Sequence, residues 1–163
     1  YQYTDCPLYW ISVIYLNFAE AKAEMGSLTQ DDLNNSINKL QARAGLPAMT
    51  TTPDADPANN MGVSNLIWEI RRCRRCELIM DNWYRYWDLI RWHQLDKLDS
   101  TKYPNTMLGA NVSNVPDCEE ATKNGYIDAS DAQIRTYEAK HYFYPIPTTQ
   151  LTLNKNMKQN PGW

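Results

Sequence analysis

The sequence predicts a mainly α-helical fold that ends in a long irregular region. Apolar residues recur at steps of three and four in several segments before residue 98, capping residues and Gly or Pro stops flank these segments, and the periodicity then fades. We expect three consecutive parts: a helical hairpin over residues 1–48, a loop and two helices over 49–98, and irregular loops with a C-terminal tail over 99–163.

The first predicted helix runs from Pro7 or Leu8 to Met25. Gly26 follows it at the position where a left-handed C-cap is favoured. Apolar residues at helical spacing form one stripe, which we expect to face the core. The stripe contains Ile11, Ile14, Phe18, Ala21 and Met25.

The second predicted helix begins after Thr29, a good N-cap, and ends before Gly45 and Pro47. Asp31 and Asp32 in its first turn complement the helix dipole. Because the connection to the first helix is only about four residues long, the two helices should form an antiparallel hairpin. Such a pair is typical of tetratricopeptide-like repeats. One hairpin cannot form a solenoid alone, so we expect neighbouring repeats from a portion N-terminal to this chain.

Two further helices follow a predicted surface loop. Residues 50–60 are rich in Thr, Pro, Asp and Asn, which favour turns. We expect a third helix from about Val63 to Met80, with Ser64 as an alternative cap, and a break at residues 81–82. The fourth helix, from about Trp83 to His93, carries large apolar groups almost all round, Trp87 and Trp92 among them, which predicts burial.

Beyond residue 98 about thirty residues show no regular pattern, and long ordered loops of this kind are usually functional or docked. We expect a short helix near residues 130–137 and an extended path over 142–147, where two prolines fix the backbone. Thr148 or Thr149 should cap a single helical turn. The tail 154–163 should run irregularly over the surface, secured by Met157 and Trp163.

Composition restricts the classes of partner. The net charge is −3, which provides no broad positive field for a phosphate backbone and argues against nucleic acid. The chain lacks a run of the roughly twenty apolar residues that a spanning helix requires. Six Trp and eleven Tyr against two Phe favour aromatics with a polar edge. This bias fits sugar binding, although hydrogen-bonded rings in a core explain most of them better.

The four cysteines are Cys6, Cys73, Cys76 and Cys118. An even count in an exported protein is compatible with disulfides, and one involving Cys6 or Cys118 stays open. The C-x-x-C of Cys73 and Cys76 lacks a second close pair, so we expect no metal site and no cofactor. Cys73 instead shares a helical face with three apolar residues and should act as a small core residue. These are Leu66, Ile70 and Met80.

We expect no catalysis. The acidic residues that could form a glycosidase-like pair, Glu77, Asp81 and Asp88, fall within a helical charge pattern. His93 and His141 are the only imidazoles and should be packing or surface residues. The Arg run at residues 71–75 could clamp an anion, but pairing with carboxylates three positions away on helices explains it better. The predicted pairs are Arg74 with Glu77, Arg85 with Asp88 and Asp88 with Arg91.

The irregular region contains the best candidates for ligand binding. Sugar recognition requires aromatic faces for the apolar side of a pyranose and amides or charged groups for its hydroxyls, usually presented on loops. An ordinary polar loop is the competing interpretation for each residue separately. The candidate residues are Tyr103, Asn105, Asn111, Asn114 and Tyr126.

Several motifs occur together in a characteristic order. They are N-F-A-E-A-K-A-E at residues 17–24, Q-A-R-A-G-L at 41–46, W-D-L-I-R-W at 87–92, P-I-P at 145–147 and Q-N-P-G-W at 159–163. In this order and spacing the chain resembles the C-terminal portion of the SusD/RagB family of nutrient-binding outer-membrane lipoproteins. Two local departures concern helix packing: Cys73 stands where the family often has Glu, and residues 81–84 are one residue longer than the usual turn.

The resemblance implies a SusD-like fold and a function in polysaccharide utilisation. A protein of this family would sit on the cell surface of a Bacteroidetes-type outer membrane, held by an N-terminal lipid anchor outside this chain. It would bind oligosaccharide or polysaccharide fragments and deliver them to a TonB-dependent SusC-like transporter, without breaking a bond. The alternatives are a peptide-binding member of the family and a helical-repeat scaffold for protein interactions. The resemblance also implies that the main binding residues can lie N-terminal to this chain.

Overall fold

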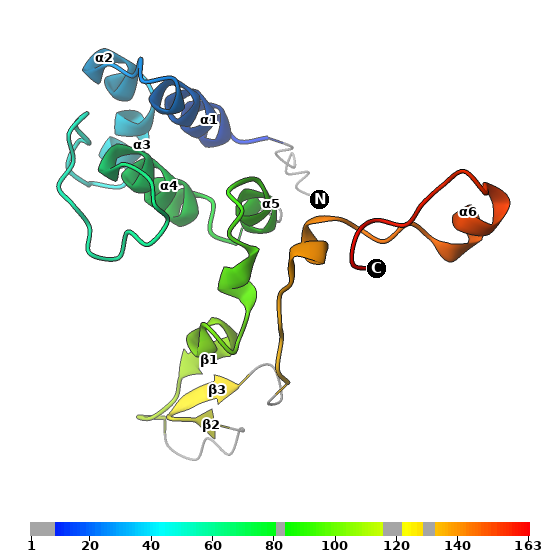
Figure 1. The fold of residues 1–163 in the computed structure, drawn as a ribbon. Coiled ribbons are helices and arrows are strands. Elements are labelled where there is room, and N and C mark those ends of the chain that lie inside the picture. Colours follow the sequence, from blue (N-terminus) through cyan, green and yellow to red (C-terminus); the bar gives the residue numbers. More distant parts are fainter. Residues whose placement is uncertain (1–8, 81–83, 116–121, 129–132) are drawn as a thin grey trace, which may run out of the picture. The chain divides into compact units, whose positions relative to one another are not determined.

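The computed structural model describes residues 9–80, 84–115, 122–128 and 133–163. These residues are mostly helical, as predicted (Figure 1). The chain divides into two compact units, residues 1–85 and 86–163, which we describe separately. The predicted boundaries near residues 48 and 98 stay predictions.

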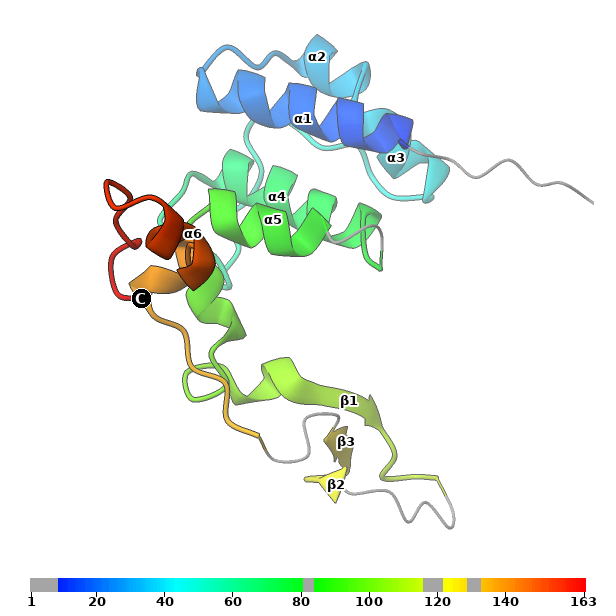
Figure 2. The same cartoon turned by 90° about the vertical axis from the view of Figure 1, so that its right-hand side faces the viewer.

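The first unit is a helical assembly. α1 (Ile11–Glu24) is followed by α2 (Gln30–Asn34), α3 (Ile37–Arg43) and α4 (Asn65–Glu77). α1 packs against both α3 and α4, and Figures 1 and 2 show these helices side by side. Fully buried aliphatic side chains from all four helices fill the core between them. These are Leu16, Leu33, Ile37 and Ile70.

The predicted orientation of α1 is wrong. Val13, Leu16 and Ala19 are buried, whereas the predicted core stripe faces outward. Ile14 is 57% exposed and Met25 70% exposed. The apolar spacing is compatible with burial of either face of α1, and contact with α3 and α4 buries the face that carries Val13, Leu16 and Ala19. The tetratricopeptide-like character of the hairpin stays a prediction.

The second predicted helix is broken into α2 and α3. Thr29 caps α2 in a capping box with Asp32, as its position indicates. At Ser36 the backbone leaves the helical region (φ −131, ψ −98), and its Oγ donates a hydrogen bond to the Asp32 carbonyl at 2.6 Å. A serine that bonds to the preceding turn offers the backbone an alternative to a continuous helix.

The predicted loop over residues 50–60 contains no helix or strand. Trp68 of α4 holds it in place, because its Nε1 donates to Asp56 Oδ2 at 3.0 Å, which lowers the pKa of that carboxyl. Ser64 caps α4 as predicted, by accepting a hydrogen bond from the Ile67 amide. The helix ends at Glu77 rather than Met80. Met80 is fully exposed and therefore does not share the predicted apolar face.

The second unit begins within α5 (Tyr84–Arg91) and contains short elements. Its core is formed by Leu89, Trp92 and Leu95. The prediction that the fourth helix is buried all round is wrong for Trp87, which is 55% exposed; Trp83 lies outside the described residues. The 3₁₀ helices are η1 (Leu95–Leu98), η2 (Pro104–Met107) and η3 (Ala139–Tyr142), and the last helix is α6 (Thr148–Leu153).

The region predicted to lack regular structure forms a small antiparallel sheet of order β1-β3-β2. Its strands are β1 (Leu108–Asn111), β2 (Thr122–Lys123) and β3 (Tyr126–Asp128). Asn124 and Gly125 join β2 to β3, and both have positive φ (54° and 82°). Asn-Gly is the strongest short-range signal for a two-residue hairpin, and it was available in the sequence.

The C-terminal segment is largely extended and irregular, as expected. The helix predicted near residues 130–137 is absent from residues 133–137, and η3 follows them instead. α6 begins after the prolines, but its N-cap is Pro147 and makes no side-chain cap bond. Trp163 secures the tail by donating from Nε1 to the carbonyls of Lys140 and Phe143, at 3.1 and 3.0 Å.

Candidate functional site

The small sheet brings some of the predicted ligand-binding residues together. Asn111 on β1 lies opposite Tyr126 on β3 in the strand register. Directly opposed residues on antiparallel strands project to the same face of a sheet, about 5 Å apart at Cβ. Asn111 is exposed and Tyr126 is half-buried. The strand register thus pairs an amide residue with an aromatic residue.

The turn after β1 carries Asn114, which is exposed. This turn is joined to the hairpin, because the Val112 amide donates to the Gly125 carbonyl at 2.7 Å. The Asn111 side chain accepts a hydrogen bond from the Ser113 amide at 3.0 Å. Three of the five predicted residues therefore lie at one end of the sheet: Asn111, Asn114 and Tyr126.

Tyr103 and Asn105 lie at the other end of β1. Tyr103 is the N-cap of η2, its amide donates to the Asp99 carbonyl at 2.8 Å, and Lys97 Nζ lies 5.4 Å from the centre of its ring. These contacts and its partial burial indicate a mainly structural residue. Asn105 is exposed within η2. The structure therefore does not place this pair with the other three.

Asp99 joins the chain segment before the sheet to the segment after it. Its Oδ1 accepts a hydrogen bond from the Thr101 amide at 2.9 Å, and its Oδ2 accepts one from the Tyr137 amide at 3.2 Å. Hydrogen bonds to the ionised carboxylate, led by the Thr101 hydroxyl, lower the pKa of Asp99 to about 2. Ser100 and Arg135 pair beside it through their backbones at 2.9 Å. The two chain segments that lead to and from the sheet are thus joined.

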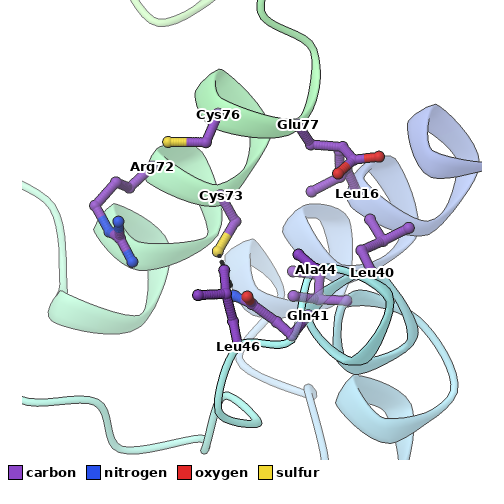
Figure 3. A pocket seen from close by; sticks show the side chains of 10 residues that line it. Leu16, Leu40, Gln41, Ala44, Leu46, Arg72, Cys73, Cys76 and Glu77 are labelled. Atoms are coloured by element: carbon purple, nitrogen blue, oxygen red, sulfur yellow. Dashed lines mark hydrogen bonds between the residues drawn. The ribbon is translucent and has the colours of Figure 1, made fainter.

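The first unit contains a pocket that sequence reasoning missed, between α3 and α4 (Figure 3). Its empty volume is about 590 Å³, including open solvent at its mouth. Gln41 Nε2 donates to Cys73 Sγ at 3.0 Å across it. Apolar side chains line one part, and Arg72, Cys73, Cys76 and Glu77 line another. The apolar lining residues are Leu16, Ile37, Leu40, Ala44 and Leu46.

Three arginines of α4, Arg71, Arg72 and Arg74, contact carboxylates or amides. Arg71 contacts Glu20 at 3.2 Å and Glu24 at 2.9 Å on α1. Arg74 donates to Asn17 at 2.8 Å. Arg72 pairs with Glu69, and Arg43 of α3 pairs with Glu77 at 2.6 Å. Structural pairing accounts for Arg71, Arg72 and Arg74, as predicted for the cluster, but most of these pairs join two helices and only the pair of Arg72 with Glu69 has the predicted spacing of three. The predicted pair of Asp88 and Arg91 is present at 2.9 Å.

The two histidines make packing contacts, as predicted. The His93 ring lies 5.0 Å from Tyr142, and His141 contacts Trp163 and accepts a hydrogen bond from the Glu138 amide. Among the described residues, no group of three or more His, Cys, Asp or Glu is arranged to hold a metal ion.

Cys73 and Cys76 are free thiols. Burial, as the largest cause, raises the pKa of the half-buried Cys73 to about 12, consistent with its predicted core role. Cys76 is exposed. The predictions for Cys6 and Cys118 fall outside the described residues, as does Asp81.

Within the described ranges, no helix combines the length and apolarity needed to cross a bilayer.

The first unit is a helical assembly, and the second unit contains a small sheet at one end of which two amide residues and a tyrosine lie. The model of the SusD family matches residues 1–163. The chain therefore belongs to the SusD family.

Solved structures agree with this assignment. A SusD-like protein from Bacteroides fragilis is 26% identical, with a TM-score of 0.61, over 93% of this chain and 25% of that one. The protein named BT4246 is 23% identical, with a TM-score of 0.63, over 96% of this chain and 23% of its own. At this identity the likeness supports the assignment of the fold and nothing further. The chain thus spans about a quarter of the length of these structures. No curated protein matches it.

Proposed function

We propose that this protein captures oligosaccharide or polysaccharide fragments at the cell surface and delivers them to a SusC-like, TonB-dependent transporter. The observation that carries the proposal is the SusD family match over residues 1–163. Binding and hand-over require no bond cleavage. The protein would therefore act at equilibrium, held at the outer membrane by a lipid anchor.

Within this chain, the end of the sheet formed by Asn111, Asn114 and Tyr126 is the surface we propose for ligand contact. It offers an aromatic ring for the apolar face of a sugar and amides for its hydroxyls. The backbone pairing of β1 and β2 with β3 supports this proposal, because it brings Asn111 opposite Tyr126. Tyr103 and Asn105 would contribute only to a ligand long enough to follow β1.

Calorimetric titration of the full-length protein with glycan fragments, preceded by a glycan array, tests the ligand class. We expect saturable binding of at least one glycan and no release of reducing ends from it. Reducing-end release in a sensitive assay would instead indicate a glycoside hydrolase. Saturable binding of peptides with no glycan binding would replace glycan by peptide as the ligand.

Delivery requires contact with the transporter. We expect the tagged full-length protein to co-purify with a SusC-like barrel from detergent-solubilised outer membranes. Binding of protein partners without any binding of glycan or peptide would support the helical-repeat scaffold instead.

A further inference from the structure

Cys73 and Cys76 lie within one turn of α4, and both line the pocket between α3 and α4 (Figure 3). Both are free thiols. Because α4 ends at Glu77, Cys76 belongs to its last turn, which is held by fewer backbone hydrogen bonds than the helix interior. Two thiols therefore open onto one cavity at the less constrained end of a helix.

The spacing of the two cysteines suits a disulfide at the level of the backbone. Cα atoms three positions apart in an α-helix are separated by about 5 Å, within the range of about 4.4–6.8 Å that disulfides span. Their Cβ atoms are normally about 5–6 Å apart, whereas a disulfide requires about 3.8 Å. Closure therefore requires a shift of roughly 1–2 Å within the last turn of α4.

The end of α4 can take up such a shift. Its last residue, Glu77, is held from α3 by Arg43, whose side chain is 65% exposed. An ion pair with a solvent-exposed partner restrains a helix only weakly. Leu78 follows as a buried C-cap whose backbone has already left the helical region (φ −103, ψ 23). The burial of Leu78 confines the shift to the turn that precedes it.

The two thiols differ in access. Cys76 is exposed, whereas Cys73 is half-buried and accepts a hydrogen bond from Gln41 Nε2 at 3.0 Å. Burial, as the largest cause, raises the pKa of Cys73 to about 12, and the nearby Cys76 adds to this rise, which places the thiols within electrostatic reach of each other. An exposed thiol beside a shielded one is typical of an attacking and a resolving cysteine.

We propose that Cys73 and Cys76 form a reversible disulfide within α4 by exchange with an external disulfide. The Cys76 thiolate attacks one sulfur of the external disulfide, which releases one thiolate and leaves a mixed disulfide on Cys76. Cys73 then loses its proton to solvent and attacks Cys76 Sγ, which expels the second thiolate. The external disulfide gains the two electrons that the two cysteines lose. This reaction is independent of the proposed ligand.

Closure changes the contact between α3 and α4. Figure 3 shows the Cys73 sulfur directed toward Gln41 rather than toward the Cys76 sulfur. To reach Cys76, the Cys73 sulfur has to leave this hydrogen bond. Gln41 is buried on α3, and a buried amide that loses its partner is costly, so its side chain has to rearrange. The redox state of the pair thus controls how α4 is attached to α3.

Incubation of the full-length protein with glutathione disulfide tests the pair. Trypsin cleaves after Arg74 and Arg75, so a disulfide between the two cysteines holds together two peptides that separate on reduction. We expect mass spectrometry to find this linked pair without bound glutathione, and dithiothreitol to separate it. Cys76 that carries glutathione beside an unmodified Cys73 would overturn the proposal. So would a link from either cysteine to a third one, or no oxidation at all.

Substitutions separate the two steps. Cys73→Ser should stop the reaction at the mixed disulfide, so that Cys76 keeps bound glutathione, and Cys73→Ala should behave in the same way. Cys76→Ser should bind at least about tenfold less glutathione in the same time, because the remaining thiol is shielded and protonated. Equal binding by the Cys73 and Cys76 variants would contradict the proposed order of attack.

Amide hydrogen exchange of the reduced and oxidised full-length protein tests the structural consequence. We expect exchange over residues 74–78 to accelerate about tenfold or more on oxidation, because the last turn of α4 is distorted. The double variant Cys73→Ser/Cys76→Ser, treated with glutathione disulfide, is the matched control and should not change. Unaltered exchange in a protein that carries the disulfide would overturn the control of the α3–α4 contact by the pair.

Discussion

Asn38 and Met49 exchange two hydrogen bonds in the first unit. Asn38 Nδ2 donates to the Met49 carbonyl at 3.1 Å, and the Met49 amide donates to Asn38 Oδ1 at 2.7 Å. Both residues are buried. The side-chain amide thus makes the two hydrogen bonds that the backbone of a neighbouring strand would make. These bonds attach the loop after α3 to that helix.

Asn38→Ala should therefore lower the free energy of unfolding by about 2 kcal/mol. The Met49 amide would lose its partner in a buried position, whereas its carbonyl also accepts a hydrogen bond from Gln30 Nε2 at 3.0 Å. Urea denaturation of the full-length protein measures the change. Asn156→Ala, at an exposed position, is the control. Equal stability of the two variants would show that the exchange contributes little.

Gly125→Ala should open the hairpin. A Cβ at this position would lie 2.0 Å from Ser113 Oγ, and the φ of +82° is also unfavourable for alanine. We expect amide hydrogen exchange over residues 108–115 to accelerate about tenfold or more, because a cost of about 1.4 kcal/mol corresponds to a factor of ten. Gly62→Ala has a similar φ of +67° but open space, so it separates backbone strain from collision. Unchanged exchange in Gly125→Ala would be inconsistent with this geometry.

Tyr126→Ala should weaken glycan binding at least about fivefold, which corresponds to about 1 kcal/mol. Tyr126→Phe retains the ring and should lose less. Tyr9→Ala is the matched control, because Tyr9 is 80% exposed and lies in the other unit. Calorimetry gives the Kd of each variant. An affinity unaltered by Tyr126→Ala would remove this residue from the proposed ligand surface.

Asp99 should make stability depend on pH in the acid range. Its folded pKa of about 2 lies below the ordinary value of 3.8, so its contribution is fully present above pH 4 and is lost as the pH falls towards 2. We expect the difference in stability between the wild type and Asp99→Asn to shrink over this range. Urea denaturation at several pH values measures it. A difference that stays constant from pH 5 to about 2 would disprove the role of the ionised carboxylate.

Cys76 should react with iodoacetamide well before Cys73. At pH 8 a thiol with a pKa of about 12 is almost entirely protonated, and Cys73 is also half-buried, whereas Cys76 is exposed. Peptide mapping of the reduced full-length protein after brief alkylation measures the ratio, and the urea-unfolded protein is the control. Equal rates in the native protein would contradict the burial of Cys73.

Much of the helical framework could be predicted because its signals are local. Thr29 and Ser64 cap the helices that they were expected to cap, and the loop over residues 50–60 has the expected composition and structure. A cap acts on amides two or three residues away, so a short window of sequence contains the complete interaction. The Asn124-Gly125 hairpin signal is equally local, although the periodicity around it predicts no regular structure.

The candidate surface could be predicted only in part. The sequence provides residues suited to sugars at Tyr103, Asn105, Asn111, Asn114 and Tyr126, but chemistry alone does not determine which of them meet. Strand pairing joins Asn111 to Tyr126 and leaves Tyr103 beside Lys97. This pairing depends on register across about fifteen residues, which periodicity within either strand does not encode.

The sequence by itself determined that this protein is a mainly helical member of the SusD family, because helix caps, apolar spacing and ordered motifs are properties of short segments. Only the tertiary structure decided which face of α1 is buried, where the second helix breaks and which loop residues pair. α1 is apolar on two opposite sides, so its own pattern satisfies either orientation. The choice depends on contact with α3 and α4, which are distant in sequence and close only after folding.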